Sequence, residues 1–247
     1  MASIRILSLN INAGFDLSRR RFLLPALRDA VRTIGADVVL LQEVLGEHAG
    51  HARRHAPWPS QAQYDYLADA FWPHHAYGRN ADFAEGHQGN ALLSRFPIAS
   101  HGNHDVSIAG HEARGLLHAA VQVPDAPRPL HLVNVHLGLH ESHRQRQVAQ
   151  LLGFIDANVP PGLPLVVAGD FNDWRARAHR LLRAAGLREA FEDSRGRLAL
   201  TFPSLRPVLP LDRIYLRDTR AVTTSVLHAR PWSRLSDHCG LLAEIHT

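Results

Sequence analysis

The chain has 247 residues, of which 45% are apolar and 20% charged, the ordinary balance of a soluble globular protein. This length allows one large domain or two small ones with a sizeable core, and we expect a single domain over residues 1–247. All 27 basic residues are arginine, and the net charge is +4. A mild positive excess suits an anionic substrate but is too small to establish nucleic-acid binding by itself.

The sequence also bears on location. It has no apolar run of about 18 residues, so we expect no transmembrane segment. The N-terminal stretch MASIRILSLNI has the pattern of a first strand rather than a signal peptide. The single cysteine, Cys239, excludes an internal disulfide and favours a reducing compartment. We therefore expect a cytoplasmic protein, and nothing implies a stable protein partner.

The first part of the chain predicts a strand–helix–strand unit. Residues 4–11 and 37–42 form apolar runs typical of strands, while 20–34 has helical spacing and Gly35 as its C-cap. The polar, proline-broken stretch 46–62 predicts a surface loop. A helix is then predicted over 63–71, and strands over 75–80, 89–94, 99–108 and 115–123.

The second part repeats this mixture of strands and helices. Predicted strands cover 129–136, 165–168, 211–216, 221–228 and 240–245; helices cover 141–158 and 177–185; 192–210 is loop-like. Two halves of this kind, without a linker between them, favour one domain with two packed sheets and outer helices.

The stretch Leu163 to Asp173, LPLVVAGDFND, delivers polar residues at the tip of a buried strand. Gly169 is expected to end the strand, and Asp170, Asn172 and Asp173 follow it. Rigid strand tips are a common way to position reactive groups. The alternative is an Asx-rich loop in which Asp173 caps the next helix.

Eight polar residues share the same placement at the ends of apolar runs: Asn10, Glu43, His136, Asp170, Asn172, Asp212, Asp237 and His238. Each alone has an ordinary structural explanation; Asp212, for example, could pair locally with Arg213. Carboxylates brought together repel one another and need a cation between them. Oxygen ligands without cysteine point to a hard metal, Mg²⁺ with Mn²⁺ as a possible substitute.

The segments LSLNI, LQEV, GNALLSRFPI, NVHLG, GDFND, DRIYL and SDH occur in the order seen in the endonuclease/exonuclease/phosphatase superfamily, and the chain resembles it from about residue 4 to 246. The resemblance implies an α/β protein with the DNase I-like fold. This is a four-layer α/β/β/α sandwich of two mixed, mainly antiparallel sheets, with the site at one edge. His136 and Val44 set the chain apart from the apurinic-site endonuclease branch, and the pattern looks closest to small bacterial metal-dependent hydrolases.

The resemblance also implies roles by position. Glu43 resembles the principal metal carboxylate, supported by Asn10 and Asp237. Asp170 resembles the residue that orients or deprotonates the attacking water or holds a second metal, an alternative that the superfamily leaves open. Asn172 resembles the residue that positions water and phosphate.

Two histidines complete the implied catalytic set. His238 resembles the histidine near the scissile phosphate, oriented by Asp212, and His136 resembles one that contacts a phosphate oxygen or assists the leaving group. Asn90, Arg114 and Arg79 are candidate phosphate contacts, although each could equally be an ordinary turn residue or loop ion pair.

These expectations describe a Mg²⁺-dependent hydrolase of phosphoester bonds, first of all a phosphodiesterase acting on nucleic acid by in-line attack of water. The alternative is a phosphodiesterase or phosphatase acting on a phospholipid head group or small phosphoester, with a non-catalytic binding protein as a minor alternative. The discriminating feature is whether the loops 46–62, 80–88 and 195–210 present arginines or apolar side chains around the cleft.

Overall fold

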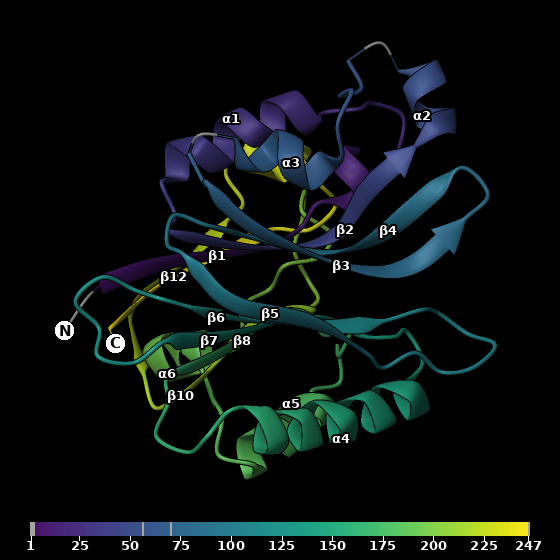
Figure 1. Ribbon diagram of the computed structural model, residues 1–247. Helices are drawn as coiled ribbons and strands as arrows, with labels where there is room; N and C mark the ends of the chain where they lie inside the picture. The colour runs from purple at the N-terminus through teal and green to yellow at the C-terminus, as the bar shows by residue number, and fades with distance from the viewer. Residues whose placement is uncertain (1–2, 56, 70, 247) are drawn as a thin grey trace.

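Two six-stranded sheets lie face to face in the computed structural model, with helices on both outer faces (Figure 1). The structure describes residues 3–55, 57–69 and 71–246. Residues 1–2 and 247 of the expected domain, 56 of the predicted loop and 70 of the predicted helix lie outside the described residues. The four layers confirm the expected α/β/β/α sandwich.

The first sheet runs, in spatial order, β11 (Arg220–Leu227), β12 (Gly240–His246), β1 (Ser3–Asn10), β2 (Val38–His48), β4 (Gly86–Ser94) and β3 (His74–Phe83). The second runs β5 (Ile98–Asp105), β6 (Gly115–Val121), β7 (Leu130–His136), β8 (Leu165–Asp170), β10 (Asp212–Arg217) and β9 (Arg188–Glu189). Neighbouring strands are antiparallel except for β1 with β2 and β7 with β8.

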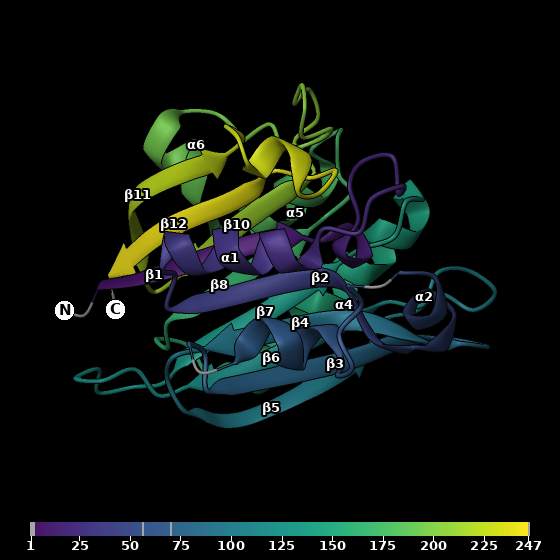
Figure 2. The same ribbon diagram turned by 90° about the horizontal axis from the view of Figure 1, so that it is seen from above.

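Helices α1 (Leu24–Ile34) and α3 (Gln63–Ala68) cover the first sheet, with α1 running above β1 and β2 (Figure 2). Helices α4 (Glu141–Asn158) and α5 (Arg177–Ala184) cover the second. The shorter helices are α2 (Ala49–Arg54), α6 (Ala190–Arg195), η1 (Asn12–Gly14) and η2 (Trp232–Arg234). Each parallel strand pair is joined by a crossover helix, α1 or α4, as parallel pairing requires.

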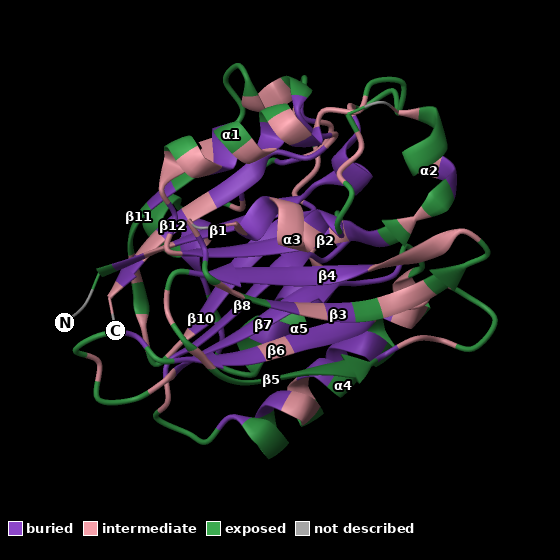
Figure 3. Ribbon diagram, turned by 45° about the horizontal axis from the view of Figure 1, so that its top comes forward, coloured by how far each residue is buried: buried purple, intermediate pink, exposed green. Residues whose placement is uncertain are grey.

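The central strands are buried on both faces, which explains their continuous apolar runs (Figure 3). In β1, Ile4 and Ile6 face the space between the sheets, whereas Leu7 and Leu9 pack toward α1. Buried Asn134 links the two sheets, because its Nδ2 donates to the carbonyls of Leu41 and Ala91, each at 2.9 Å.

Several predicted boundaries were wrong. The first helix begins at Leu24 rather than at residue 20, because Pro25 fits only its first turn. The predicted loop 46–62 contains the end of β2 and all of α2, and the loop-like stretch from 192 begins inside α6. Strand β8 continues through Gly169 to Asp170. No helix in the described ranges is long and apolar enough to cross a membrane.

Candidate active site

The register of three strands brings His136, Asp170 and Asp212 side by side. His136 at the end of β7 is paired with Asp170 at the end of β8, and Asp170 is paired in turn with Asp212 at the start of β10. Gly169 allows this close pairing, since a Cβ at that position would collide with the carbonyl oxygen of Val135.

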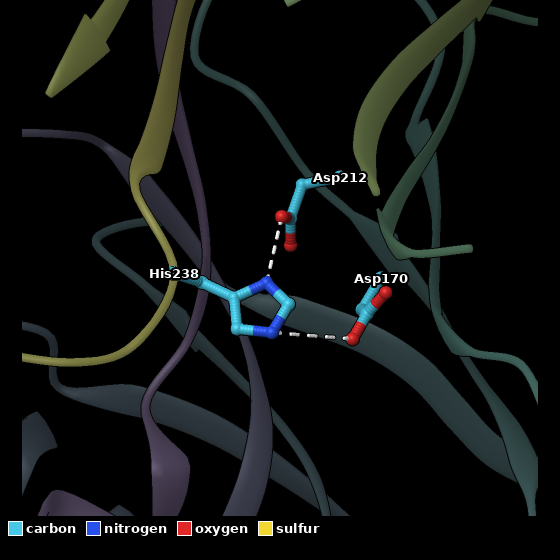
Figure 4. A group of neighbouring side chains, drawn as sticks. All are labelled: Asp170, Asp212 and His238. Carbon is cyan, nitrogen blue, oxygen red and sulfur yellow. Dashed lines mark hydrogen bonds and ion pairs between the residues drawn. The ribbon is translucent and has the colours of Figure 1, made fainter. Parts of the chain in front are cut away.

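His238 lies between two carboxylates (Figure 4). Its Nδ1 is 2.8 Å from Oδ2 of Asp212, and its Nε2 is 3.8 Å from Oδ2 of Asp170. All three side chains are at most 6% exposed. The other carboxylate oxygen of Asp212, Oδ1, is buried and has no hydrogen-bond partner among the residues described. The Asp212–His238 bond fixes the ring so that Nε2 points toward Asp170.

The surroundings give the two buried histidines different charges. Burial by itself lowers the pKa of His238, but Asp212 and Asp170 outweigh it and hold this pKa well above its usual range. Burial, with smaller effects from Arg114 and His238, holds the pKa of His136 well below its usual range. The arrangement therefore favours a protonated His238 and a neutral His136, the kind of division that acid–base chemistry uses.

Asn10 joins Asp170 to Glu43. Its Nδ2 donates to Oε1 of Glu43 at 3.1 Å and to Oδ2 of Asp170 at 3.2 Å. The side chain of Glu43 is aimed by an irregularity in β2, where the pairing with β4 shifts and Glu43 adopts a φ of 55°. A glutamate in the left-handed region is strained, and such strain is characteristic of functional sites.

Asp237 enters from the loop before β12. The preceding residue, Ser236, donates its hydroxyl to the carbonyl of Asn10 at 2.7 Å, which ties this loop to the tip of β1. Burial raises the pKa of the Asp237 carboxyl, His238 opposes the effect, and Glu43 adds to it. Glu43 and Asp237 are therefore close enough to repel each other.

This donor set fits a hard divalent cation. Glu43 and Asp237 supply carboxylate oxygens, and a cation would relieve the repulsion between them. Asn10 turns its Nδ2 toward Glu43, while its Oδ1 accepts the backbone N–H of Asn12, so it positions the Glu43 carboxylate. Asp170, Asp212 and His238 also place ligand atoms within 4.8 Å of one another. In that second group, however, Nδ1 of His238 already bonds to Asp212, so its geometry is that of an oriented histidine.

A cationic side chain stands over the same site. The side chain of Arg114 is partly buried, and no ion pair or partner for its Nε is found in the described part of the chain. Burial lowers the pKa of Arg114, while the carboxylates of Glu112, Asp170 and Glu43 oppose this shift. Asn90 lies beside it, and its buried Oδ1 likewise lacks a partner within those residues. The guanidinium of Arg114 could receive an anion. The Oδ1 of Asn90 is an acceptor, and its Nδ2 already donates to the carbonyls of Gly115 and Asn134.

The stretch after β8 serves two purposes. The backbone N–H of Asn172 donates to Oδ1 of Asp170, and its Nδ2 donates to the carbonyl of Leu137, each at 2.9 Å. The carboxylate of Asp173 points away from the cleft and accepts the backbone N–H groups of Arg177 and His179 in α5. Asp173, rather than Asp212, pairs with Arg213, at 3.2 Å. The capping role is thus correct for Asp173 alone.

The cleft above these groups has a volume of about 330 Å³ and an apolar wall. Leu139, Trp174, Phe202 and Leu209 line it beside Arg114 and the two histidines. Arg79, a candidate phosphate contact, instead forms an exposed ion pair with Asp82 on the β3–β4 hairpin, outside the cleft.

Some side chains at the site were absent from the sequence prediction. Nη2 of Arg19 lies 3.1 Å from Oε2 of Glu43, and its Nε donates to Asn12 at 2.8 Å. Trp174 stacks on the guanidinium of Arg144 at 4.9 Å. Arg19 belongs to a run of three arginines in which no local pattern distinguishes it, whereas Trp174 follows the GDFND motif directly.

This fold and these strand-tip residues are those of a member of the Endonuclease/Exonuclease/phosphatase family, whose family model matches residues 7–238. The chain belongs to this family, which confirms the resemblance found in the sequence and makes the protein a phosphoester hydrolase in general terms.

Among individual proteins, the chain is 49% identical over 245 residues to YbhP of Escherichia coli K12, described as uncharacterized, and the match covers 99% of this chain and 96% of that one. An endonuclease/exonuclease/phosphatase from Bacteroides vulgatus has a similar structure, with a TM-score of 0.78, 18% identity and coverage of 100% and 99%. TDP2 of D. rerio, complexed with a single-strand DNA product, gives 0.70 at 18% identity, with full coverage of both chains.

Proposed function

We propose that the protein is a Mg²⁺-dependent phosphodiesterase. One observation carries the proposal: several groups with different chemical roles lie in the same cleft. His238 is oriented by Asp212 and faces Asp170, and Arg114 lines the cleft with them. The Asn10–Glu43 pair and Asp237 lie next to these residues. An acid–base group, a carboxylate beside it, an anion-binding cation and a hard-metal donor set thus meet in one cleft. That combination suits the attack of water on phosphorus.

Glu43 and Asp237 would hold the metal, with Asn10 supporting Glu43 and Mn²⁺ as a possible substitute. When bound, Mg²⁺ supplies positive charge that polarises the phosphoryl oxygens and neutralises charge developing on them. The two partly buried carboxylates, and the hydrogen bond that Asn10 donates to Glu43, support this role.

The remaining roles follow from position and charge. Asp170 orients the attacking water and accepts its proton, with service as a second metal ligand as the alternative. Asn172 holds Asp170 through its backbone N–H and contributes to positioning water and phosphate. The protonated Nε2 of His238, with Asp212 behind it, donates to the phosphoryl group or the leaving oxygen. His136 and Arg114 contact phosphate oxygens, and Asn90 would join them only by turning its amide away from the carbonyls of Gly115 and Asn134. The reaction breaks one P–O bond and yields a monoester and an alcohol.

The sequence predicts nucleic acid as the substrate. The side chains that line the cleft test this prediction. Of the residues lining the cleft, Arg114 is the one arginine found within the described ranges, while five others carry large apolar side chains. The loop 195–210 presents both kinds of side chain, because Leu205 and Val208 are exposed at 59% and 58% and Arg195, Arg197 and Arg206 are exposed as well. The apolar wall of the cleft itself favours the second candidate, a phosphodiester with an apolar portion such as a phospholipid.

We also retain the single domain over residues 1–247 and the cytoplasmic location as proposals. The burial of Cys239, the one cysteine of the chain, is consistent with a protein that has no use for a disulfide.

The test is hydrolysis of bis(p-nitrophenyl) phosphate and p-nitrophenyl phosphate with Mg²⁺, Mn²⁺ or EDTA. We expect metal-dependent cleavage of the diester. Arg114→Gln should raise KM about 10-fold or more through loss of a charged hydrogen bond, whereas Arg79→Gln, outside the cleft, should behave as wild type. Cleavage of the monoester alone, or activity in EDTA, would contradict the proposal.

A further inference from the structure

A second hollow of about 700 Å³ lies beside the catalytic cleft, and we call it the apolar groove. Its walls come from three segments: the loop 16–23, the loop that carries Leu205, and residues 230–235 around η2. Leu17, Leu23, Leu205 and Leu235 supply much of its surface. The catalytic residues discussed above do not line it.

Each segment that lines the groove is linked, directly or through a neighbouring residue, to a residue of the proposed metal site. Arg19, which pairs with Glu43, belongs to the loop that contains Leu17. Leu235 directly precedes Ser236 and Asp237. The backbone N–H of Ser204 donates to the carbonyl of Asp237 at 2.8 Å, and Leu205 is the next residue. All three walls of the groove therefore begin at the proposed metal site.

Exposed apolar side chains concentrate around these two hollows. Nine large hydrophobic residues are exposed in the described part of the chain, and five of them line the groove or cleft or lie in the loop between them. These are Leu17 at 41%, Leu139 at 54%, Trp174 at 43%, Leu205 at 59% and Val208 at 58%. Exposed apolar side chains gathered around two hollows are typical of an interaction site.

Positive charge surrounds this apolar surface. Arg21, Arg230 and Arg234 line the groove, and Arg206 follows Leu205. All four are exposed, and among the described residues none of them forms an ion pair with a carboxylate. The acidic residue of the groove, Asp16, accepts hydrogen bonds from Ser18 and from the backbone N–H groups of Arg20 and Arg21. Three arginines and one carboxylate line the groove, so it carries an excess of positive charge.

We propose that the apolar groove and the mouth of the cleft dock on an anionic phospholipid surface. Four of the five exposed side chains are aliphatic, and leucine and valine insert between acyl chains but offer no flat ring for a nucleic-acid base to stack on. The arginines are placed to meet lipid phosphates at the rim. This inference rests on the proposed function and adds to it that the phosphoester substrate lies in a lipid surface. Docking itself requires no hydrolysis.

The test is binding of the full chain, in EDTA, to vesicles of phosphatidylcholine with and without 30 mol% phosphatidylglycerol, followed by sedimentation. We expect binding to the anionic vesicles that weakens at high salt. Arg230→Gln with Arg234→Gln should lower the partition coefficient about 25-fold, since each basic residue near such a surface contributes about 5-fold. Leu17→Asn with Leu205→Asn should lower it about 10-fold or more through lost apolar burial.

Matched controls come from two elements that do not line the groove. Leu181 and Val222 are exposed at 44% and 47%, comparable with Leu17, and lie on α5 and β11 away from the groove. Leu181→Asn and Val222→Asn should bind vesicles as wild type. Thermal unfolding of every variant separates loss of docking from loss of the fold.

Three results would overturn the inference: no binding to anionic vesicles, equal binding to neutral ones, or equal weakening by the control substitutions. Tight binding of a 12-mer oligodeoxythymidylate that depends on Leu17, Leu205, Arg230 and Arg234 would instead assign the surface to nucleic acid. Failure of the proposed hydrolysis is recognised separately, because it appears with the soluble diester and Mg²⁺, whereas docking is measured in EDTA.

Discussion

Asp212 and His238 stand 26 residues apart in the chain, yet Oδ2 of Asp212 lies 2.8 Å from Nδ1 of His238. Asp212 begins β10 and His238 precedes β12, so the bond joins the second sheet to a loop of the first. Because the bond holds Nε2 toward Asp170, orientation of the histidine depends on the packing of both sheets.

Asp212→Asn should lower kcat for the diester about 10²- to 10⁴-fold, the contribution of an oriented acid–base group. The amide is nearly isosteric, so the fold and KM should change little. Steady-state kinetics with Mg²⁺ measure this, and Asp218→Asn, at an exposed carboxylate after β10, is the control. Wild-type kcat in Asp212→Asn would show that the Asp–His bond has no catalytic role.

Arg19→Met should tighten binding of Mg²⁺ several-fold. The Arg19 guanidinium is 64% exposed and competes with a cation for Oε2 of Glu43, and such an exposed ion pair stabilises the protein by at most about 1 kcal/mol. Isothermal titration calorimetry with Mg²⁺ or Mn²⁺ measures the affinity, with Arg20→Met as the matched control. Unchanged or weaker affinity would argue against Glu43 as a metal ligand beside Arg19.

Arg213→Met should destabilise the protein by about 3–5 kcal/mol, because it leaves the buried carboxylate of Asp173 without its cation. Both side chains are at most 1% exposed, and Arg213 also donates to the carbonyl of Asp173 at 2.7 Å. Urea unfolding measures the loss. Arg188→Met, which removes the exposed pair with Asp193, should cost no more than about 1 kcal/mol. Equal losses would mean that the buried pair is unimportant.

The buried histidine pair on the outer face of the second sheet makes stability fall in acid. Nε2 of His118 lies 3.0 Å from Nδ1 of His131, and burial, with His131 as a smaller cause, lowers the pKa of His118 to about 4. The unfolded chain therefore binds the proton more tightly than the folded one, and stability drops as pH falls from 6.5 toward 4. With allowance for solvent at the partly exposed ring, the loss is about 2 kcal/mol, or about 5 °C in Tm.

Thermal unfolding between pH 7 and pH 4 measures this effect. His118→Gln keeps a polar partner for His131 and should make the decline shallower, whereas His101→Gln, at an exposed histidine of β5, should leave it unchanged. An identical decline in both variants would place the acid sensitivity elsewhere.

The core strands could be predicted from the sequence because strands buried on both faces have continuous apolar runs, as in β1, β2 and β8. It missed α2, whose residues are polar and proline-flanked. The helix is held by packing of its rings, such as His51 stacked on Trp58 at 5.1 Å, which no local pattern reveals. Trp72 lies in the core, and its Nε1 donates to the carbonyl of Ala36.

The site was predictable to the extent that polar residues at strand tips share one edge. His136, Asp170 and Asp212 come together because strand register fixes them there. Arg19 was not predictable, because its approach to Glu43 depends on the loop 16–23 folding back through the bridge between Phe15 and Phe22. The apolar groove depends on the same fold-back and on two other distant segments.

The most direct measurement is Mg²⁺-dependent hydrolysis of bis(p-nitrophenyl) phosphate by the wild type and by Asp170→Ala. Asp170 is the carboxylate on which Asn10, Asn172, His136 and His238 converge. We expect metal-dependent cleavage by the wild type, and a loss of activity of about 10²-fold or more in a folded Asp170→Ala protein. Wild-type activity in that variant, with its fold confirmed by thermal unfolding, would contradict the assignment of this cleft as the active site.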